Sequence, residues 1–207
     1  MDTLVINSER DFIKVRSFFS EDKKLKLIIN KDIVFTSYIK PITNLEGYTI
    51  FIEGNNHKIQ NIFIYKESSL NGLFSAVKNL YVNNLNIDSV NIYAGTLTGS
   101  LCGDVSNEAV LNNVNLTSAK ISSEAFGGGL IGSAKKIECH DCNVESEVHG
   151  YDVVGGLCGM TDLYIKENTT VNSKVMGFLK LIGPEVGYCE ETREENTSVN
   201  KKRRKLF

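Results

Sequence analysis

Tryptophan is absent from this 207-residue sequence, and proline occurs only twice. Glycine, asparagine and serine are instead frequent between short runs of valine, isoleucine and leucine, a profile that favours strands over helices. No apolar run approaches the roughly 18 residues of a membrane-spanning helix. The first residues also lack the basic and apolar segments of a secretory signal. We therefore expect no membrane contact and an intracellular protein, cytoplasmic or, in a eukaryotic cell, nuclear.

Cysteine usage and net charge further narrow the class of protein. The five cysteines are an odd number and lie within strand patterns, which fits reduced thiols better than a disulfide framework. The net charge of −2 by itself favours neither nucleic acid nor membrane as a partner. The charge is unevenly distributed, because five of the 23 basic residues fall in the range 201–205 and leave the rest of the chain acidic.

A short glycine-rich phrase returns along the chain. It reads Gly-Gly-Leu-Ile-Gly at 128–132 and Gly-Gly-Leu-Cys-Gly at 155–159, with variants at 71–75, 99–103 and 181–183. Measured at the residue after leucine, successive copies are 28, 29, 27 and 24 residues apart. A repeat of this length is one supersecondary unit that cannot bury its own apolar face, so neighbouring copies must stack.

Each repeat also carries a leading strand with three apolar residues, spaced three and then two residues apart. The three sets are Val82, Leu85 and Ile87; Leu111, Val114 and Leu116; Cys139, Cys142 and Val144. When repeats place apolar residues at equivalent positions, the simplest structure is a coil whose like residues stack as interior ladders. Its strands pair in parallel with the turns above and below. The predicted fold class is therefore all-β, a single-stranded parallel β-helix, or solenoid.

The N-terminal region is expected to close one end of this solenoid. Ser8 is suited to cap a short amphipathic helix over residues 9–19, with an acid three residues later. Phe12, Val15 and Phe19 recur at helical spacing, so the helix should lie on the first turn of the solenoid. Strands are expected to follow at 25–29 and 33–35 and in the alternating segment before a Gly-Asn-Asn corner at 54–56.

We divide the chain into three regions. Residues 1–45 form the N-terminal cap with the helix and the first strands, and residues 46–189 form the coils of the solenoid. Residues 190–207 form a flexible tail, first acidic and then basic.

Three segments precede the glycine phrases in a fixed order. They are Lys31-Asp32-Ile33, Lys40-Pro41-Ile42 and the turn segment 53–59, which reads Glu-Gly-Asn-Asn-His-Lys-Ile. Together with the phrases they resemble the opening of bacterial GLUG-motif proteins, over roughly residues 5–185. The resemblance implies a right-handed parallel β-helix with a short N-terminal helix. It also implies a stalk or binding module of a surface protein, such as an adhesin or an IgA-peptidase-like protein, and not its catalytic part.

The segment 139–142 has the Cys-x-x-Cys spacing of a zinc or thiol-exchange site. Cys139, His140 and Cys142 supply three ligands, whereas structural zinc needs four, usually from a second pair. The repeat alignment places the two thiols under Leu111 and Val114, at interior ladder positions. We therefore interpret both cysteines as core residues, expect no cofactor, and keep the three residues as a weak alternative metal site.

Acidic residues cluster in the same coil, at Glu138, Asp141, Glu145 and Glu147. Glycosidase chemistry needs two carboxylates flanking one bond, roughly 5–10 Å apart. No adjacent coil repeats an acid at the matching position, and no lysine or arginine is spaced as a partner. We interpret the cluster as a solvated outer face and assign no catalytic residue.

Packing does not explain the basic cluster of Lys201, Lys202, Arg203, Arg204 and Lys205. Such a run repels itself and is suited to contact nucleic acid phosphates, an acidic protein surface or an import receptor. The first functional hypothesis is a non-enzymatic binding protein, such as a phage- or pathogen-encoded inhibitor or effector, that binds a host protein or nucleoprotein. The alternative is a bacterial surface adhesin or stalk module. A polysaccharide lyase or hydrolase is the third.

Overall fold

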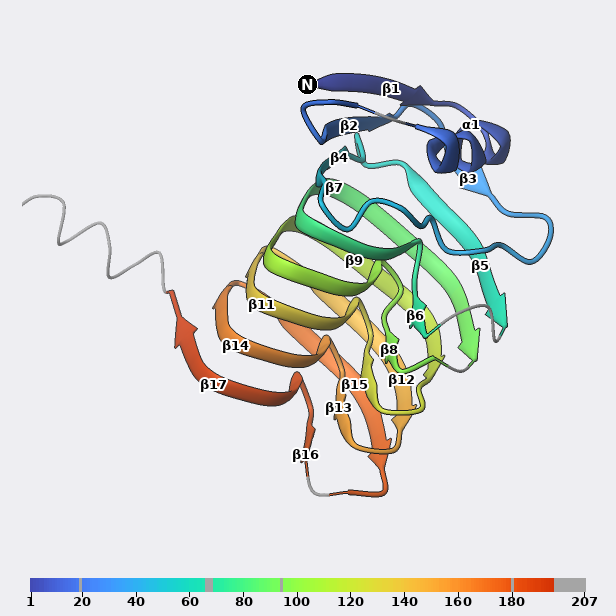
Figure 1. The fold of residues 1–207 in the computed structure, drawn as a ribbon. Coiled ribbons are helices and arrows are strands. Elements are labelled where there is room, and N and C mark those ends of the chain that lie inside the picture. The colour runs from blue at the N-terminus through green and yellow to red at the C-terminus, as the bar shows by residue number, and fades with distance from the viewer. Residues whose placement is uncertain (19, 66–68, 94, 180, 196–207) are drawn as a thin grey trace, which may run out of the picture.

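The computed structural model describes residues 1–18, 20–65, 69–93, 95–179 and 181–195. The chain winds into a solenoid of about six turns (Figure 1). Neighbouring turns are joined by parallel strand pairing, as between β7 (Phe74–Tyr93) and β9 (Cys102–Ser122). The predicted all-β parallel solenoid with a short N-terminal helix is confirmed.

The strands form three faces. The first face contains, in spatial order, β1 (Asp2–Ile6), β2 (Lys24–Ile29), β4 (Thr49–Glu53), the first parts of β7 and β9, β11 (Ile131–His140), β14 (Cys158–Glu167) and β17 (Val186–Glu194). The second face contains β3 (Ile33–Val34), β5 (Lys58–Tyr65), the later parts of β7 and β9, β12 (Asn143–Gly150) and β15 (Thr170–Gly177). The third face is a separate sheet of β6 (Leu70–Asn71), β8 (Leu97–Thr98), β10 (Phe126–Gly128), β13 (Val153–Gly155) and β16 (Leu181–Gly183).

A ladder of left-handed residues forms the corner between the first and second faces. Asn84 and Asn113 have φ of 53° and 52°, and Asp141 and Asn168, at the same place in the next two turns, have φ of 53° and 48°. Asparagine and aspartate tolerate this conformation better than other non-glycine residues. The amide of Asn113 donates to Oδ1 of Asn84 at 2.9 Å, and that of Asn168 donates to Oδ1 of Asp141 at 3.2 Å. The corner accounts for the three-residue spacing in each leading strand.

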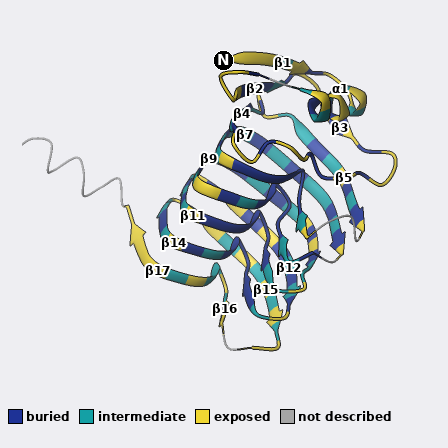
Figure 2. Ribbon diagram, in the orientation of Figure 1, coloured by how far each residue is buried: buried dark blue, intermediate teal, exposed yellow. Residues whose placement is uncertain are grey.

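Interior ladders run along the axis, as Figure 2 shows by the dark buried positions that recur from turn to turn. The register places Phe74, Cys102, Ile131 and Cys158 over one another, and none of the four is exposed. Val186 continues this ladder into β17. Burying one large apolar side chain contributes about 1.5–3 kcal/mol, so the ladders stabilise the stacking of the turns.

The last glycine phrase lies at a different place from the one predicted. Leu181–Gly183 pairs with Val153–Gly155 on the third face, so it precedes the position of the repeated phrase. Val186 is the residue that stacks on Cys158, at a spacing of 28 residues and not the 24 measured to Ile182. The true copy is the segment 183–187, in which proline and glutamate replace the second glycine and the leucine. The predicted position of the last repeat was wrong because this copy lacks the second glycine and the leucine that identify the other copies.

The N-terminal helix is shorter than predicted. α1 spans Glu9–Lys14, and a 3₁₀ turn follows over Val15–Ser17, whereas residues 9–19 were expected to be helical. Ser8 caps the helix as predicted, because its hydroxyl accepts a hydrogen bond from the Asp11 amide at 3.3 Å. Phe12 is buried, with its ring 5.8 Å from that of Phe35, so the helix packs on the N-terminal turns. Phe19 lies outside the described residues.

The C-terminal turn is more exposed than the others. β17 pairs with β14 as far as Glu194, past residue 189, where the sequence places the start of a flexible tail. Phe178 is 84% exposed, and its ring lies 5.8 Å from that of Tyr151.

No helix in the described part of the chain has the length and apolar character needed to cross a membrane.

Close approach of the turns makes Gly128 difficult to replace. A Cβ atom there would lie 2.0 Å from the carbonyl oxygen of Ile131 and 2.8 Å from Cα of Cys158. Because both contacts are backbone atoms, we expect Gly128→Ala to lower the free energy of unfolding by about 3 kcal/mol. Gly47→Ala is the matched control, since its Cβ would meet only the Lys23 side chain, at 3.3 Å. Urea denaturation measures both, and equal stability of the two variants would contradict the prediction.

Candidate binding face

The Cys-x-x-Cys pair lies inside the solenoid. Cys139 is fully buried and stacks on Leu111, as the repeat alignment predicts, and Cys142 is only 2% exposed. The Cys142 thiol lies 3.4 Å from the carbonyl oxygen of Leu111. His140 lies instead on the outer face, where its ring nitrogens contact the carboxylates of Glu138 and Glu167 at 3.5 and 3.2 Å. The three candidate ligands therefore do not converge, and among the described residues no group of three His, Cys, Asp or Glu is arranged to hold a metal.

The outer side of the first face carries a network of charged groups across four strands. The Tyr81 hydroxyl donates to Glu108 at 2.9 Å, and Lys136 donates to the other oxygen of Glu108 at 2.8 Å. Lys136 also pairs with Glu138. The chain continues through His140, whose Nδ1 lies 3.2 Å from a carboxylate oxygen of Glu167 on β14.

This network corrects one expectation from the sequence. Lys136 does serve as a basic partner of Glu138, although none was expected in this coil. It lies two residues from Glu138, on the same side of β11, and the adjacent turn supplies Glu108. The other acids of the cluster lie elsewhere, because Asp141 occupies the corner and Glu145 and Glu147 lie on β12 of the second face. The acidic residues of this coil therefore do not form one paired site.

The second face presents two adjacent columns of outward side chains. Register aligns them from β5 to β15: one column is Phe63, Asn91, Lys120, Glu147 and Lys174, and the other is Tyr65, Tyr93, Ser122, His149 and Met176. We call these ten residues the binding face. Five strands about 4.8 Å apart make the columns roughly 19 Å long.

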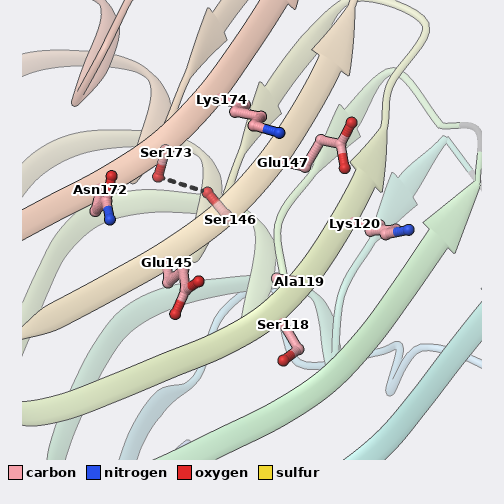
Figure 3. Close-up of a pocket in the computed structure, with 9 residues that line it drawn as sticks. All are labelled: Ser118, Ala119, Lys120, Glu145, Ser146, Glu147, Asn172, Ser173 and Lys174. Carbon is pink, nitrogen blue, oxygen red and sulfur yellow. Dashed lines mark hydrogen bonds between the residues drawn. The ribbon is translucent and has the colours of Figure 1, made fainter.

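The C-terminal half of the binding face is hollowed. A depression of about 390 Å³ is lined by residues of β9, β12 and β15, among them Lys120, Glu147 and Lys174 (Figure 3). A second depression of about 270 Å³ lies between Tyr93, Glu147 and His149. Lys120 and Glu147 line both, so the two hollows are neighbours on this face.

A missing residue in β12 accounts for the position of the larger hollow. Ser89 and Ser118 occupy one bulged position in β7 and β9, with φ of 58° and 53°. β12 lacks this extra residue, and its register against β9 shifts between Val144 and Ser146. Below the shift, Ser146 is buried and its hydroxyl lies 2.8 Å from that of Ser173, as the dashed line in Figure 3 shows. The hollow thus begins where the bulge ends.

Charges in the larger hollow are balanced. Lys120, Lys174, Glu145 and Glu147 all line this hollow, which gives two groups of each sign. A carboxylate oxygen of Glu147 lies 3.2 Å from Nε2 of His149. Within the described ranges, neither Lys120 nor Lys174 forms an ion pair. Both ammonium groups therefore retain donor capacity for another molecule.

Aromatic rings cover the N-terminal half of the binding face. Tyr65 and Tyr93 are 52% and 40% exposed, with ring centroids 6.4 Å apart. Phe63 meets Tyr93 edge to face at 6.1 Å, and Tyr38, from the loop after β3, lies over Phe63 at 4.2 Å. Cross-strand aromatic pairs of this kind stabilise a sheet, and here they also expose a large apolar area.

Sequence reasoning missed the binding face. Its residues belong to the variable outer positions of the repeats, and only their register brings them into columns. One signal was present: the repeat shortens from 29 to 27 residues where β11 and β12 each lose one residue relative to β9. The predicted contact cluster Lys201, Lys202, Arg203, Arg204 and Lys205 lies outside the described residues and stays a prediction.

Comparison with protein families, with curated proteins and with solved structures finds no match to this chain.

Burial predicts which thiols react in the folded protein. Burial raises the pKa of the Cys158 thiol to about 12 and that of Cys102 still further, while a hydrogen bond to Cys142 and then burial raise the pKa of Cys139. Cys189 alone among the five is partly exposed. We expect iodoacetamide at pH 8 to modify Cys189 first, because the thiolate is the nucleophile. Peptide mass spectrometry measures the extent of modification at each cysteine, and protein unfolded in guanidinium is the control. Rapid labelling of Cys158 in the native state would contradict the prediction.

The charged network predicts a pH-dependent contribution to stability. The hydrogen bond from Lys136 lowers the pKa of Glu108, and hydrogen bonds to Glu108 and Glu138 raise the pKa of Lys136 to about 12. The Glu108 contribution is present above its ordinary pKa of 4.5 and is lost as pH falls through the lowered value. The Lys136 contribution is present below its ordinary pKa of 10.5 and is lost as pH rises through about 12.

We expect Lys136→Met to lower the free energy of unfolding by about 1 kcal/mol at pH 7 and by less at pH 3. Urea denaturation at the two pH values measures the difference from the natural chain. Lys135→Met, at an exposed neighbour, should change little at either pH. A loss for Lys136→Met that is the same at pH 3 as at pH 7 would contradict the assigned role.

Proposed function

We propose that this protein is a non-enzymatic binding protein whose binding face contacts a macromolecule. The observation that carries the proposal is the alignment of Lys120, Glu147 and Lys174 in one column of a sheet, beside two neighbouring hollows. Ligand sites combine concave surface with a few convergent polar groups, and this face has both. Its length of roughly 19 Å suits an extended partner better than a compact metabolite.

Rigidity supports the same proposal. β9 and β12 are each paired on both sides, and β15 pairs with β12 and packs Val171 and Val175 against the core, so side chains on this face keep their spacing. A preorganised surface loses little conformational entropy on binding, which favours affinity. The first face, by contrast, has its acids satisfied by Lys136, His140 and Tyr81.

A second candidate function is an adhesin or stalk module related to the GLUG-motif proteins. The segment 183–187 supports the relationship, because it stacks in the place of the glycine phrase of the next repeat, at a regular spacing of 28 residues. The larger hollow, lined by two lysines and two glutamates, also fits an adhesin better than the nucleoprotein partner expected from the basic cluster at 201–205. The binding face itself is common to both candidates.

Affinity capture with paired variants tests the proposal. Lys120→Glu/Lys174→Glu reverses the two uncommitted charges of the binding face, and Lys78→Glu/Lys135→Glu makes the same change at exposed lysines elsewhere. We expect the control variant to capture as much material from a lysate of the native source as the natural chain does. The binding-face variant should capture at least tenfold less. The captured material is assayed for protein, nucleic acid and glycan.

Two outcomes would contradict the proposal: capture of nothing by the natural chain, or equal capture by both double variants. A third chain, ending at residue 200, tests the basic cluster separately. Loss of nucleic acid from that chain alone would assign the cluster and leave the binding face unaffected.

A further inference from the structure

We infer that the ligand of the binding face is a neutral glycan chain, which lies along the two columns with sugar rings on the aromatic half and hydroxyls at the charged half. This inference rests on the proposed function and names its ligand class. It is carried by three features of one surface: exposed rings, balanced charges in the larger hollow, and a second hollow beside it that shares Lys120 and Glu147.

The aromatic half provides a platform for flat apolar groups. Tyr38, Tyr65 and Tyr93 are 63%, 52% and 40% exposed on neighbouring turns of one face. Tyrosine rings of this kind combine an apolar face with a hydroxyl that can form hydrogen bonds. Sugar rings have the complementary surface, because one side displays C–H groups while hydroxyls project from the edge. Exposed apolar patches of this kind commonly mark interaction sites.

The polar half matches a ligand without net charge. Lys120 and Lys174 supply donors, and Glu145 and Glu147 supply acceptors, within one hollow. Sugar hydroxyls donate and accept, so they can use both kinds of group at once. A polyanion would be repelled by the two glutamates of this hollow, and a polycation would be repelled by its two lysines.

Charge balance separates this inference from single-stranded nucleic acid, the other ligand that stacks on aromatic rings. Proteins that bind single strands combine aromatic stacking with a positively charged groove. Here Glu147 lies between Lys120 and Lys174 in the same column, so the phosphate track would cross a carboxylate. Nucleic acid is therefore the outcome that would overturn the inference.

The test uses affinity electrophoresis of the full chain in gels containing soluble neutral polysaccharides: laminarin, mixed-linkage β-glucan, xylan, mannan and amylose. Heparin and poly(dT) serve as charged comparisons. We expect retardation in at least one neutral gel and a loss of affinity of tenfold or more in Tyr65→Thr/Tyr93→Thr, because threonine keeps the strand propensity and removes the rings. Tyr93→Phe should retain binding, since the ring remains.

Phe51→Thr is the matched control, because Phe51 and Tyr81 form a stacked pair, at 5.0 Å, on the first face. Its affinity should equal that of the natural chain. Thermal unfolding of each variant confirms that the fold persists.

Three results would overturn the inference: no retardation in any neutral gel, undiminished binding by Tyr65→Thr/Tyr93→Thr, or tighter binding of poly(dT) than of every neutral glycan. If glycans fail while capture of a protein still depends on Lys120 and Lys174, the ligand class is wrong and the proposed function stands. If both experiments fail, the binding face itself is wrong.

Discussion

Parallel pairing at a constant register is the constraint on which this structure depends. Each turn satisfies its backbone hydrogen bonds with the turns on either side, so equivalent residues must stand over one another along the axis. Inside, this stacks Phe74, Cys102, Ile131 and Cys158 into a dry ladder. At the corner it stacks asparagine amides within hydrogen-bonding distance. Outside, it turns single residues of a repeat into columns, and the binding face is two such columns.

The same constraint explains why cysteine and glycine are structural here. Cys139 and Cys142 look like a ligand pair in the sequence, yet the register places both thiols against the interior ladders. Gly128 lies where the next turn approaches too closely for any side chain. Residues that often indicate chemistry are used instead to bring the turns together. The chemistry that remains is on the outer faces, where side chains are free of the packing requirement.

The two outer faces differ in how far their polar groups are already satisfied. On the first face, Glu108, Lys136, Glu138, His140 and Glu167 form a connected series of contacts across the strands. On the second face, the bulge shared by Ser89 and Ser118 ends at β12, where the larger hollow lies, and Lys120 and Lys174 form no ion pair with the described residues. The first face is thus a self-satisfied surface, and the second face has capacity for a ligand.

The repeat spacing, the apolar pattern and the Ser8 cap were sufficient to predict a parallel solenoid with a short N-terminal helix, because interior positions obey a strict residue-type rule. They also placed Cys139 in its ladder. The phase of the last repeat was not predictable from residue type, since Val186 and its neighbours have lost the glycine phrase and only strand pairing identifies them.

The binding face could not be predicted from the sequence either, because outward positions do not require a particular residue type. Tyr65, Tyr93, Lys120 and Glu147 are dispersed among polar residues of separate repeats, and a register shift of one residue would send each to the opposite side of its strand. Composition and periodicity therefore determined the kind of fold and the contents of its core. The pairing of the turns decided which surface residues meet, because that pairing is set by backbone hydrogen bonds between segments distant in the chain.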